Sequence, residues 1–520
     1  KIRFSNESDF LFYRYFVVKY DFSILRAQIK LMDTKIIKNR KLKLWEAFIP
    51  VIALIGMLAY NVLFVYNGED DNALGGSNQF ILLLGGAIAA IMGYITKVPF
   101  HKMLDEVANN IKSTAGAILI LLMVGALAGT WMVSGIIPSM IYYGLQILSP
   151  AVFLPATLII CSVISIATGS SWTTSATVGI ALIGIGGALG FDLGMVAGAV
   201  ISGAYFGDKL SPMSDTTNLA PAMAGTDLFT HIKYMTLTTI PTYIITLILF
   251  IVLGLSVDVN GDVNINELLT SIETSFHVTP WLFLVPVIVI GLIVKKTEPL
   301  VALLVGTLLA GIFAIIFQPE IVTQITGADS LTFKSAYKGV MQAITTEVIV
   351  PTENKTLADL FTSGGMAKML PTIWLILCAM VFGGIMDAIG ALTRISESLL
   401  KLAHTTFGLF ASTVGSCLAL NITASDQYLA IVVPGKMFAK AYRDKGLAPE
   451  NLSRTLEDTG TVTSVLVPWN TCGAYQAGTL GVSTLDYLPY AFFNILSPFM
   501  TLIFAAFNIK IKQLVNTIKE

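Results

Sequence analysis

Residues 203–221 read Gly-Ala-Tyr-Phe-Gly-Asp-Lys-Leu-Ser-Pro-Met-Ser-Asp-Thr-Thr-Asn-Leu-Ala-Pro, a polar block between two apolar stretches. Ionisable side chains at membrane depth cost roughly 2.5–3.5 kcal/mol each on insertion scales, so they are rare there without a use. Gly and Pro on both sides of the block indicate broken helices, whose freed amides and carbonyls can also act as ligands. The block therefore predicts a membrane protein that binds an ion or a polar substrate.

The composition places the whole chain in the same class. Of its 520 residues, 55% are hydrophobic and only 12% are charged, whereas charged residues make up about a quarter of a soluble protein. Many apolar stretches approach the roughly 20 residues that a helix needs to span a bilayer. A β-barrel would show alternating segments of about ten residues instead, so we expect an all-α polytopic membrane protein.

Several other classes are not indicated. The four cysteines lie in apolar segments without paired spacing, which indicates neither disulfides nor zinc. The sequence has no phosphate loop of the Walker type, so direct use of ATP is not expected. The net charge of −1 gives no sign of a nucleic-acid partner. We therefore expect no cofactor, and we expect the partners to be the lipid bilayer and the transported ions or solutes.

The charge of the loops gives the expected orientation. The segment before residue 46 is strongly basic, which places the N-terminus in the cytoplasm under the positive-inside rule. The loop at 257–279 has acids and no Lys or Arg, which suits the outside. We expect a cytoplasmic N-terminal segment at 1–45, transmembrane regions at 46–256 and 280–508, the extracytoplasmic loop at 257–279 and a cytoplasmic tail at 509–520.

The first 31 residues are aromatic and of mixed charge, and they lack the layout of a signal peptide. Met32 is followed by a basic run and then by the first apolar segment. Two interpretations remain open: Met32 is the natural start, or residues 1–31 form a cytoplasmic amphipathic arm. An intact-mass measurement on the native protein would separate them.

Three sequence matches indicate an internal repeat. The segments 129–135 and 384–390 align at an offset of 255, 166–172 and 422–428 at 256, and 218–226 and 471–479 at 253. By the loop charges, span 114–137 runs outward and its counterpart 371–392 runs inward. The pattern predicts an inverted-topology repeat, in which ion and substrate sites lie at the midplane where the halves meet. Chance similarity among Gly-rich apolar segments is the alternative.

The first polar break is Thr-Gly-Ser-Ser-Trp-Thr-Thr-Ser at 168–175. A hairpin tip here would offer neutral oxygens to a hard cation such as sodium, and Ser170, Ser171 and Thr173 are its candidate ligands. The alternative is that these hydroxyls bond back to their own helix and allow close packing.

The second break is the opening block. Asp208 and Asp215 are seven residues apart, but Pro212 argues against a continuous helix between them. Lys209 could neutralise one of the two acids. The run from Asp215 through Thr216 to Asn218 offers carboxylate, hydroxyl and amide oxygens within four residues, which favours a binding site.

The third and fourth breaks lie in the second half. Ser425 and Asp426 stand where the repeat matches the first hairpin tip, and Asn470 and Thr471 precede Gly473 in another unwound turn. Glu457 and Asp458 either belong to this site or cap a helix start.

A carboxylate that binds either a cation or a proton is the minimal device for exchange. Because burial disfavours the charged form of a carboxyl group, protons can compete with sodium for it. The candidates are Asp208, Asp215, Asp426 and Asp458, with the mid-span Asp387 as a fifth.

The block at 203–218, its continuation through 224–229, and the runs 421–436 and 456–479 resemble the NhaC-type sodium/proton antiporter family. The likeness covers roughly residues 40–508 and leaves out residues 1–31. That family resembles the wider ion transporter superfamily, whose folds pair two inverted repeats, each with a re-entrant hairpin and a broken helix. The resemblance implies sodium coordination at the following residues: Ser170, Ser171, Asp215, Asn218, Asp426 and Asn470.

The leading hypothesis is a secondary transporter that exchanges sodium for protons across a bacterial-type inner membrane by alternating access. The alternative is a sodium- or proton-coupled carrier of a small organic solute such as malate, lactate or an amino acid. An organic anion would need a cation in the cavity, and only Lys209 and Lys436 lie near the breaks. By analogy with elevator-type carriers, a homodimer is expected.

An intramembrane enzyme is not expected. Ser170 with His231 could imitate a Ser/His pair, but no third group is evident and the sequence around His231 indicates a surface loop.

Overall fold

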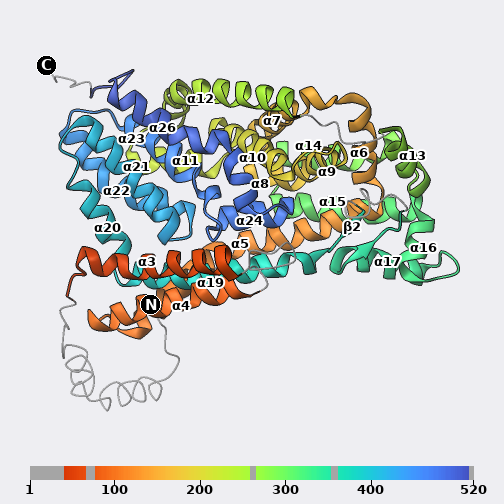
Figure 1. The fold of residues 1–520 in the computed structure, drawn as a ribbon, viewed down its shortest axis with the longest axis horizontal. Helices are drawn as coiled ribbons and strands as arrows, with labels where there is room; N and C mark the ends of the chain where they lie inside the picture. Colours follow the sequence, from red (N-terminus) through yellow and green to blue (C-terminus); the bar gives the residue numbers. More distant parts are fainter. Residues whose placement is uncertain (1–39, 66–75, 258–264, 353–360, 515–520) are drawn as a thin grey trace, which may run out of the picture.

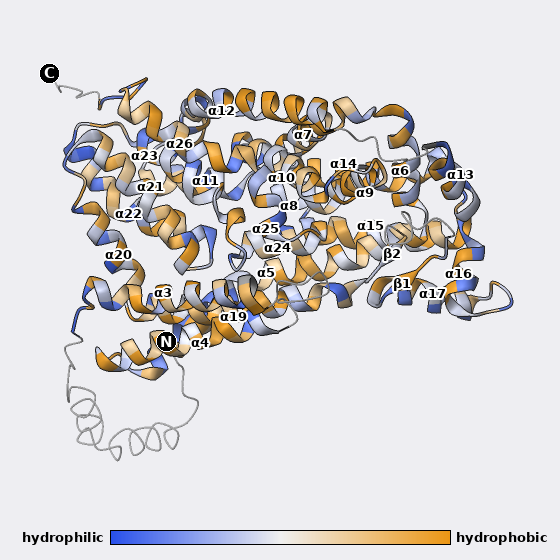
Figure 2. Ribbon diagram, viewed as in Figure 1, coloured by the Kyte–Doolittle hydropathy of each residue, from blue (hydrophilic) through white to orange (hydrophobic). Residues whose placement is uncertain are grey.

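The computed structural model describes residues 40–65, 76–257, 265–352 and 361–514. The hypotheses about residues 1–31 and Met32 lie outside the described residues. Within them, seven helices are long and apolar enough to cross a membrane, or up to nine if each bent helix pair is one span. Apolar residues cover the second half of the outer helix α12, whereas its first half also carries polar residues (Figure 2). The prediction of an all-α polytopic membrane protein is confirmed.

The first half is a series of long helices interrupted by short ones. Its elements are α3 (Leu44–Tyr60), η1 (Asn61–Val65), α4 (Ser77–Ile95), α5 (Phe100–Val133), α6 (Ile136–Ile147), α7 (Pro150–Thr168), α8 (Ser171–Thr174), η3 (Ser175–Gly179), α9 (Ile180–Ala188), α10 (Leu193–Leu210), α11 (Asp215–Ala224) and α12 (Leu228–Ser256). The span predicted from residue 114 begins at Phe100, because the polar stretch before it contains no Gly or Pro and continues the helix.

The middle of the chain is more structured than predicted. It holds α13 (Ile265–Ser275), η4 (Pro280–Phe283), α14 (Leu284–Val294), α15 (Pro299–Phe317), α16 (Pro319–Thr326), α17 (Phe333–Thr345), the antiparallel pair β1 (Val348–Ile349) and β2 (Thr362–Ser363), and η5 (Met366–Met369). The segment expected as the loop 257–279 thus contains a helix, which is bent by 83° against the next apolar helix.

The second half follows the same plan as the first. Its elements are α19 (Leu370–Ala388), α20 (Ala391–Leu400), α21 (Thr406–Thr423), α22 (Gln427–Asp444), α23 (Pro449–Leu456), η6 (Glu457–Thr461), η7 (Ser464–Leu466), α24 (Thr471–Leu480), α25 (Thr484–Tyr487), η8 (Leu488–Tyr490) and α26 (Phe492–Ala506).

Four helix caps and three left-handed turns of the two halves coincide at a spacing of 256 positions, and the turns after α5 and α19, at Gly135 and Gly390, at 255. The matched helix caps are Ser149 and Thr405, Ser170 and Asp426, Ser214 and Asn470, and Asp227 and Ser483. The left-handed turns match too, at Gly169 and Ser425, Gly190 and Gly446, and Gly225 and Gly481. The offset of 253 for the third sequence match was therefore wrong, because it aligned Gly225 with Gly478 and slipped by nearly one helical turn.

The two halves are inverted. α5 and α19 are counterparts, since a left-handed glycine follows each. They lie side by side along one edge of the molecule, opposite α12 (Figure 1). A Cβ added at Gly125, late in α5, would meet Met369 just before α19, whereas one at Gly384, late in α19, would meet Val107 early in α5. The counterparts are therefore antiparallel, which confirms the inverted repeat.

Close approach of α10 and α7 positions the polar block. A Cβ at Gly203 would lie 2.3 Å from the carbonyl oxygen of Leu158, and one at Gly207 would lie 2.5 Å from that of Ser162. Small residues four apart let two membrane helices approach at backbone distance. Asp208 follows directly, so this contact determines where its carboxylate lies.

We expect Gly207→Ala to destabilise the protein by about 1–3 kcal/mol, because the added methyl group forces α10 away from α7. Thermal unfolding in detergent measures the effect. Gly56→Ala is the matched control, since a Cβ at that helical glycine meets no atom within 4 Å. Equal melting temperatures for the two variants would contradict the proposed packing.

Candidate functional site

The two hairpin tips have the same local structure. At the first tip, Gly169 adopts a left-handed turn and Ser170 caps α8, its hydroxyl accepting a hydrogen bond from the Thr173 amide at 3.2 Å. At the second, Ser425 adopts the left-handed turn and Asp426 caps α22, its carboxylate accepting from the Leu429 amide at 3.0 Å. A left-handed conformation at a residue other than glycine costs of order 1–3 kcal/mol, so the surrounding structure must impose it at Ser425.

The two helix breaks are also alike. The Ser214 hydroxyl accepts from the Thr217 amide at 3.3 Å and begins α11, while the Asn470 side chain accepts from the Cys472 amide at 3.1 Å and begins α24. Each break lies against the hairpin tip of its own half. The Thr471 amide, for example, donates to the carbonyl oxygen of Ser425 at 3.0 Å.

A cavity of about 650 Å³ lies where tips and breaks meet. Of the predicted site residues it is lined by Ser170, Ser171, Thr173, Asp208, Asp215, Asp426 and Thr471. The remaining predicted residues, Thr216, Asn218, Ser425, Asp458 and Asn470, do not line it. Parts of α5 and the turn between α14 and α15, including Lys296 and Glu298, complete the wall.

Two of the predicted amides are engaged elsewhere. The Asn218 side chain donates to the carbonyl oxygens of Pro212 and Ser214, at 3.0 and 2.6 Å. The Asn470 side chain donates to the backbone carbonyl of Asn421 at 3.0 Å. Both side chains therefore hold the breaks in shape.

An aromatic residue on each tip reaches the broken helix of the opposite half. Trp172 stacks on Tyr475 with ring centroids 4.0 Å apart, and the Tyr475 hydroxyl donates to the Trp172 carbonyl at 3.1 Å. Tyr428, which the repeat matches to Trp172, donates its hydroxyl to the Asp215 carboxylate. The role of Tyr428 was missed in the sequence, although its match to Trp172 was the available signal.

Asp208 joins α10 to the first tip. One of its carboxylate oxygens accepts from the amide and the hydroxyl of Ser171, at 3.0 and 2.7 Å. The other oxygen has no hydrogen-bond partner among the described residues, although the side chain is buried.

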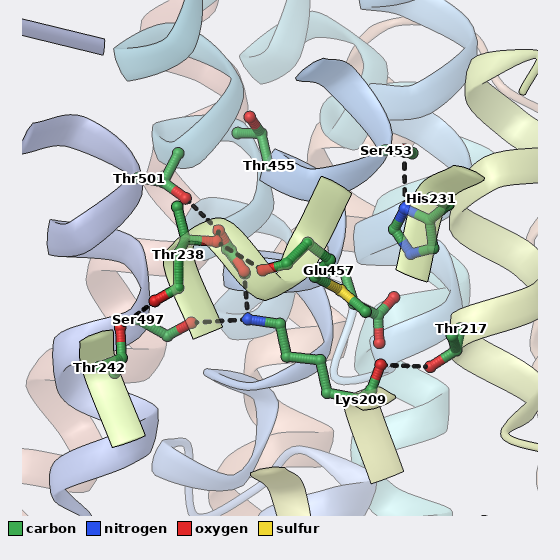
Figure 3. Close-up of polar contacts among 12 residues, drawn as sticks. Lys209, Thr217, His231, Thr238, Thr242, Ser453, Thr455, Glu457, Ser497 and Thr501 are labelled. Carbon is green, nitrogen blue, oxygen red and sulfur yellow. Dashed lines mark hydrogen bonds and ion pairs between the residues drawn. The ribbon is translucent and has the colours of Figure 1, made fainter. Parts of the chain in front are cut away.

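Lys209 neutralises Asp458 rather than Asp208 or Asp215. The two side chains form an ion pair and are fully buried. The Lys209 ammonium also donates to the Ser497 hydroxyl at 3.2 Å, and the Asp458 carboxylate accepts from Thr238 at 2.8 Å and from Thr501 (Figure 3). The charges of Lys209 and Asp458 therefore balance each other, and neither residue lines the cavity.

Glu457 and Asp458 do not cap a helix start. They follow the end of α23 and open the π-helical turn η6, where both are fully buried. The Glu457 carboxylate accepts from the Thr216 hydroxyl at 3.1 Å, which joins the second break of the first half to the second half. π-Helical turns occur frequently at functional sites, but their position is not visible in a sequence.

The pair of Ser170 with His231 is not formed. His231 lies in α12, not in a surface loop, and is fully buried. Its Nδ1 atom is 2.8 Å from the Ser453 hydroxyl (Figure 3), and it does not line the cavity that contains Ser170.

Comparison with known proteins finds a matching family and several relatives, all of which are named as antiporters. The model of the Na+/H+ antiporter family matches residues 203–509. The Na(+)/H(+) antiporter NhaC of Alkalihalophilus pseudofirmus is 38% identical over 81% of this chain and 88% of its own length, and that of Bacillus subtilis is 37% identical over 78% and 87%. The malate-2H(+)/Na(+)-lactate antiporter of Bacillus subtilis is 36% identical over 82% and 88%.

We expect Asp458→Asn to destabilise the protein by about 3–5 kcal/mol, because it leaves the Lys209 ammonium buried without its counter-charge. The double variant Lys209→Met/Asp458→Leu should recover most of the lost stability, since it removes both charges. Thermal unfolding in detergent compares the two. A single variant as stable as the wild type would show that the ion pair does not compensate the buried lysine.

Proposed function

The chain belongs to the Na+/H+ antiporter family, and from that premise we propose that it exchanges sodium for protons across the cell membrane by alternating access. The observation that carries this proposal is the cavity between the two inverted halves. Three carboxylates from both halves, Asp208, Asp215 and Asp426, line it together with the hydroxyls of the first hairpin tip. These oxygen-bearing side chains suit a hard cation, and each carboxylate can hold a proton in its place.

Sodium binds in the cavity between the Asp215 and Asp426 carboxylates and the hydroxyls of Ser170 and Ser171. These groups belong to opposite halves, so the ion joins one half to the other. Because the tips and breaks of each half pack together, a movement of one half against the other would carry the site from one side of the membrane to the other. Asn218 and Asn470 keep the breaks in shape during this movement.

We expect the wall of the cavity at the turn between α14 and α15 to face the cytoplasm. Its wall includes the turn between α14 and α15, where Lys295 and Lys296 stand together. The positive-inside rule places such a turn on the cytoplasmic side, as it does the basic N-terminal segment.

A carrier of an organic anion is less well supported. Lys209 is held by Asp458, so it does not supply the cation that such a solute would need. Lys296 is the cavity-lining lysine among the described residues, and it lies at the cavity wall with Glu298.

Proteoliposomes with an acidic interior and an internal pH dye test the proposal. We expect sodium chloride, but not potassium chloride, to alkalinise the interior without any organic solute. A response that needs malate, lactate or an amino acid would instead indicate the solute carrier.

In the same assay, Asp215→Asn should abolish sodium-dependent exchange and leave expression intact, because it removes a carboxylate from the ion path. Asp444→Asn is the matched control, since Asp444 is exposed at the end of α22. Exchange by Asp215→Asn with an unchanged apparent sodium affinity would disprove the role of Asp215.

Asp426→Asn should shift the pH profile of exchange, because it removes a titrating group but keeps a side chain that caps a helix as well as Asp does. The second tip therefore stays folded in this variant. Exchange rates measured across a range of pH give the profile, and an unaltered profile would exclude Asp426 as a proton carrier.

A further inference from the structure

A second group of oxygens adjoins the cavity through Asp208, which lines it. The Ser214 and Thr216 hydroxyls are 3.2 Å apart, and Thr216 donates to the Glu457 carboxylate at 3.1 Å. The Ser214 hydroxyl also interacts with the Asp208 carboxyl group. The four side chains come from α10, from the break before α11 and from η6, so both halves of the repeat contribute.

Both carboxylates of this group have one oxygen without a partner. Oδ1 of Asp208 and Oε2 of Glu457 accept no hydrogen bond among the described residues. Asp208 is only 7% exposed and Glu457 is not exposed at all. Buried polar atoms are nearly always hydrogen-bonded, and a buried carboxylate is costly without a counter-charge, so these two open oxygens are candidate ligands for a cation.

The cation that interacts with this pair among the described residues is engaged elsewhere. The two carboxyl groups interact electrostatically with each other and Glu457 does so with Lys209. The Lys209 ammonium is already committed to Asp458 and Ser497, however. The Asp208 and Glu457 carboxyl groups are therefore connected through the Ser214 and Thr216 hydroxyls, and the lysine that interacts with Glu457 is already paired.

We propose that Asp208, Ser214, Thr216 and Glu457 form an enclosed site that binds a dehydrated sodium ion; this rests on the sodium/proton exchange proposed above and deepens it. Oxygen ligands suit this hard cation, and two hydroxyls with two carboxylates replace its water shell. Asp208 also lines the cavity, so the ion passes from the cavity to the enclosed site along its carboxylate.

Sodium-dependent thermal stabilisation of the purified protein tests the site without measuring transport. A ligand that binds only the folded state stabilises it by RT ln(1 + [L]/Kd), so the melting temperature begins to rise once the ligand concentration exceeds Kd. We expect increasing sodium, at an ionic strength held constant with choline, to stabilise the wild type. Glu457→Gln and Thr216→Val should each raise, at least about tenfold, the sodium concentration at which the melting temperature begins to rise, since each removes a ligand.

Two further variants keep the test decisive if a change at Glu457 impairs folding. Thr216→Ser retains the hydroxyl and should respond to sodium nearly as the wild type does. Thr246→Val is the matched control, because Thr246 is buried in α12 and its hydroxyl bonds only to the carbonyl of Thr242. Wild-type sodium dependence in both Glu457→Gln and Thr216→Val would overturn the enclosed site.

The two proposals fail in different ways. Absence of sodium/proton exchange by wild-type proteoliposomes would overturn the proposed function. Normal exchange by the wild type, with sodium stabilisation that is lost in Asp215→Asn and kept in Glu457→Gln, would retain the function and confine sodium to the cavity.

Discussion

Helices that end inside a membrane must satisfy their first amides without help from bulk water, and the rest of this structure depends on how that is done. Ser170, Asp426, Ser214 and Asn470 each place a side-chain oxygen on the amides of a helix that begins at membrane depth. Because each cap is short and polar, it leaves a hydrophilic turn where a continuous helix would bury its backbone. Four such turns, brought together by the inverted repeat, produce the cavity.

The same caps explain why carboxylates can be concentrated here. Asp426 is both a cap and a cavity-lining acid, so its position is needed for the fold even without an ion. Asp208 is held by Ser171, which begins the first capped helix. Lys209 would be expected to cancel one of these charges, but the fully buried Asp458 takes it instead. Lys209 therefore balances the charge of Asp458 and not that of the cavity-lining acids, which can bind a mobile cation.

The local features of this arrangement were predictable from the sequence, whereas the contacts between the two halves were not. A polar turn inside an apolar run is a local signal, so the hairpin tips, the breaks and the inverted repeat were all predicted. Pairings between the halves depend on the register of packed helices, which no single segment encodes. The bond between Tyr428 and Asp215 spans 213 positions and that between Lys209 and Asp458 spans 249. The part of Glu457 in the proposed enclosed site depends on a π-helical turn and on the bond from Thr216, and neither the turn nor this pairing is visible in the sequence.

The cost of burying charge explains why the cavity supports the exchange of two ions rather than the uptake of one. An empty site of bare carboxylates in a low-dielectric interior would be too costly to move through the membrane, so it must first be neutralised in part by sodium or by protons. Sodium and protons both reduce the negative charge of the site, so one of them is not needed when the other is bound. A carrier built on this constraint returns across the membrane only when it is loaded with one ion or the other. Obligatory exchange thus follows from the cost of burying charge, and it requires no separate device that couples the two ions.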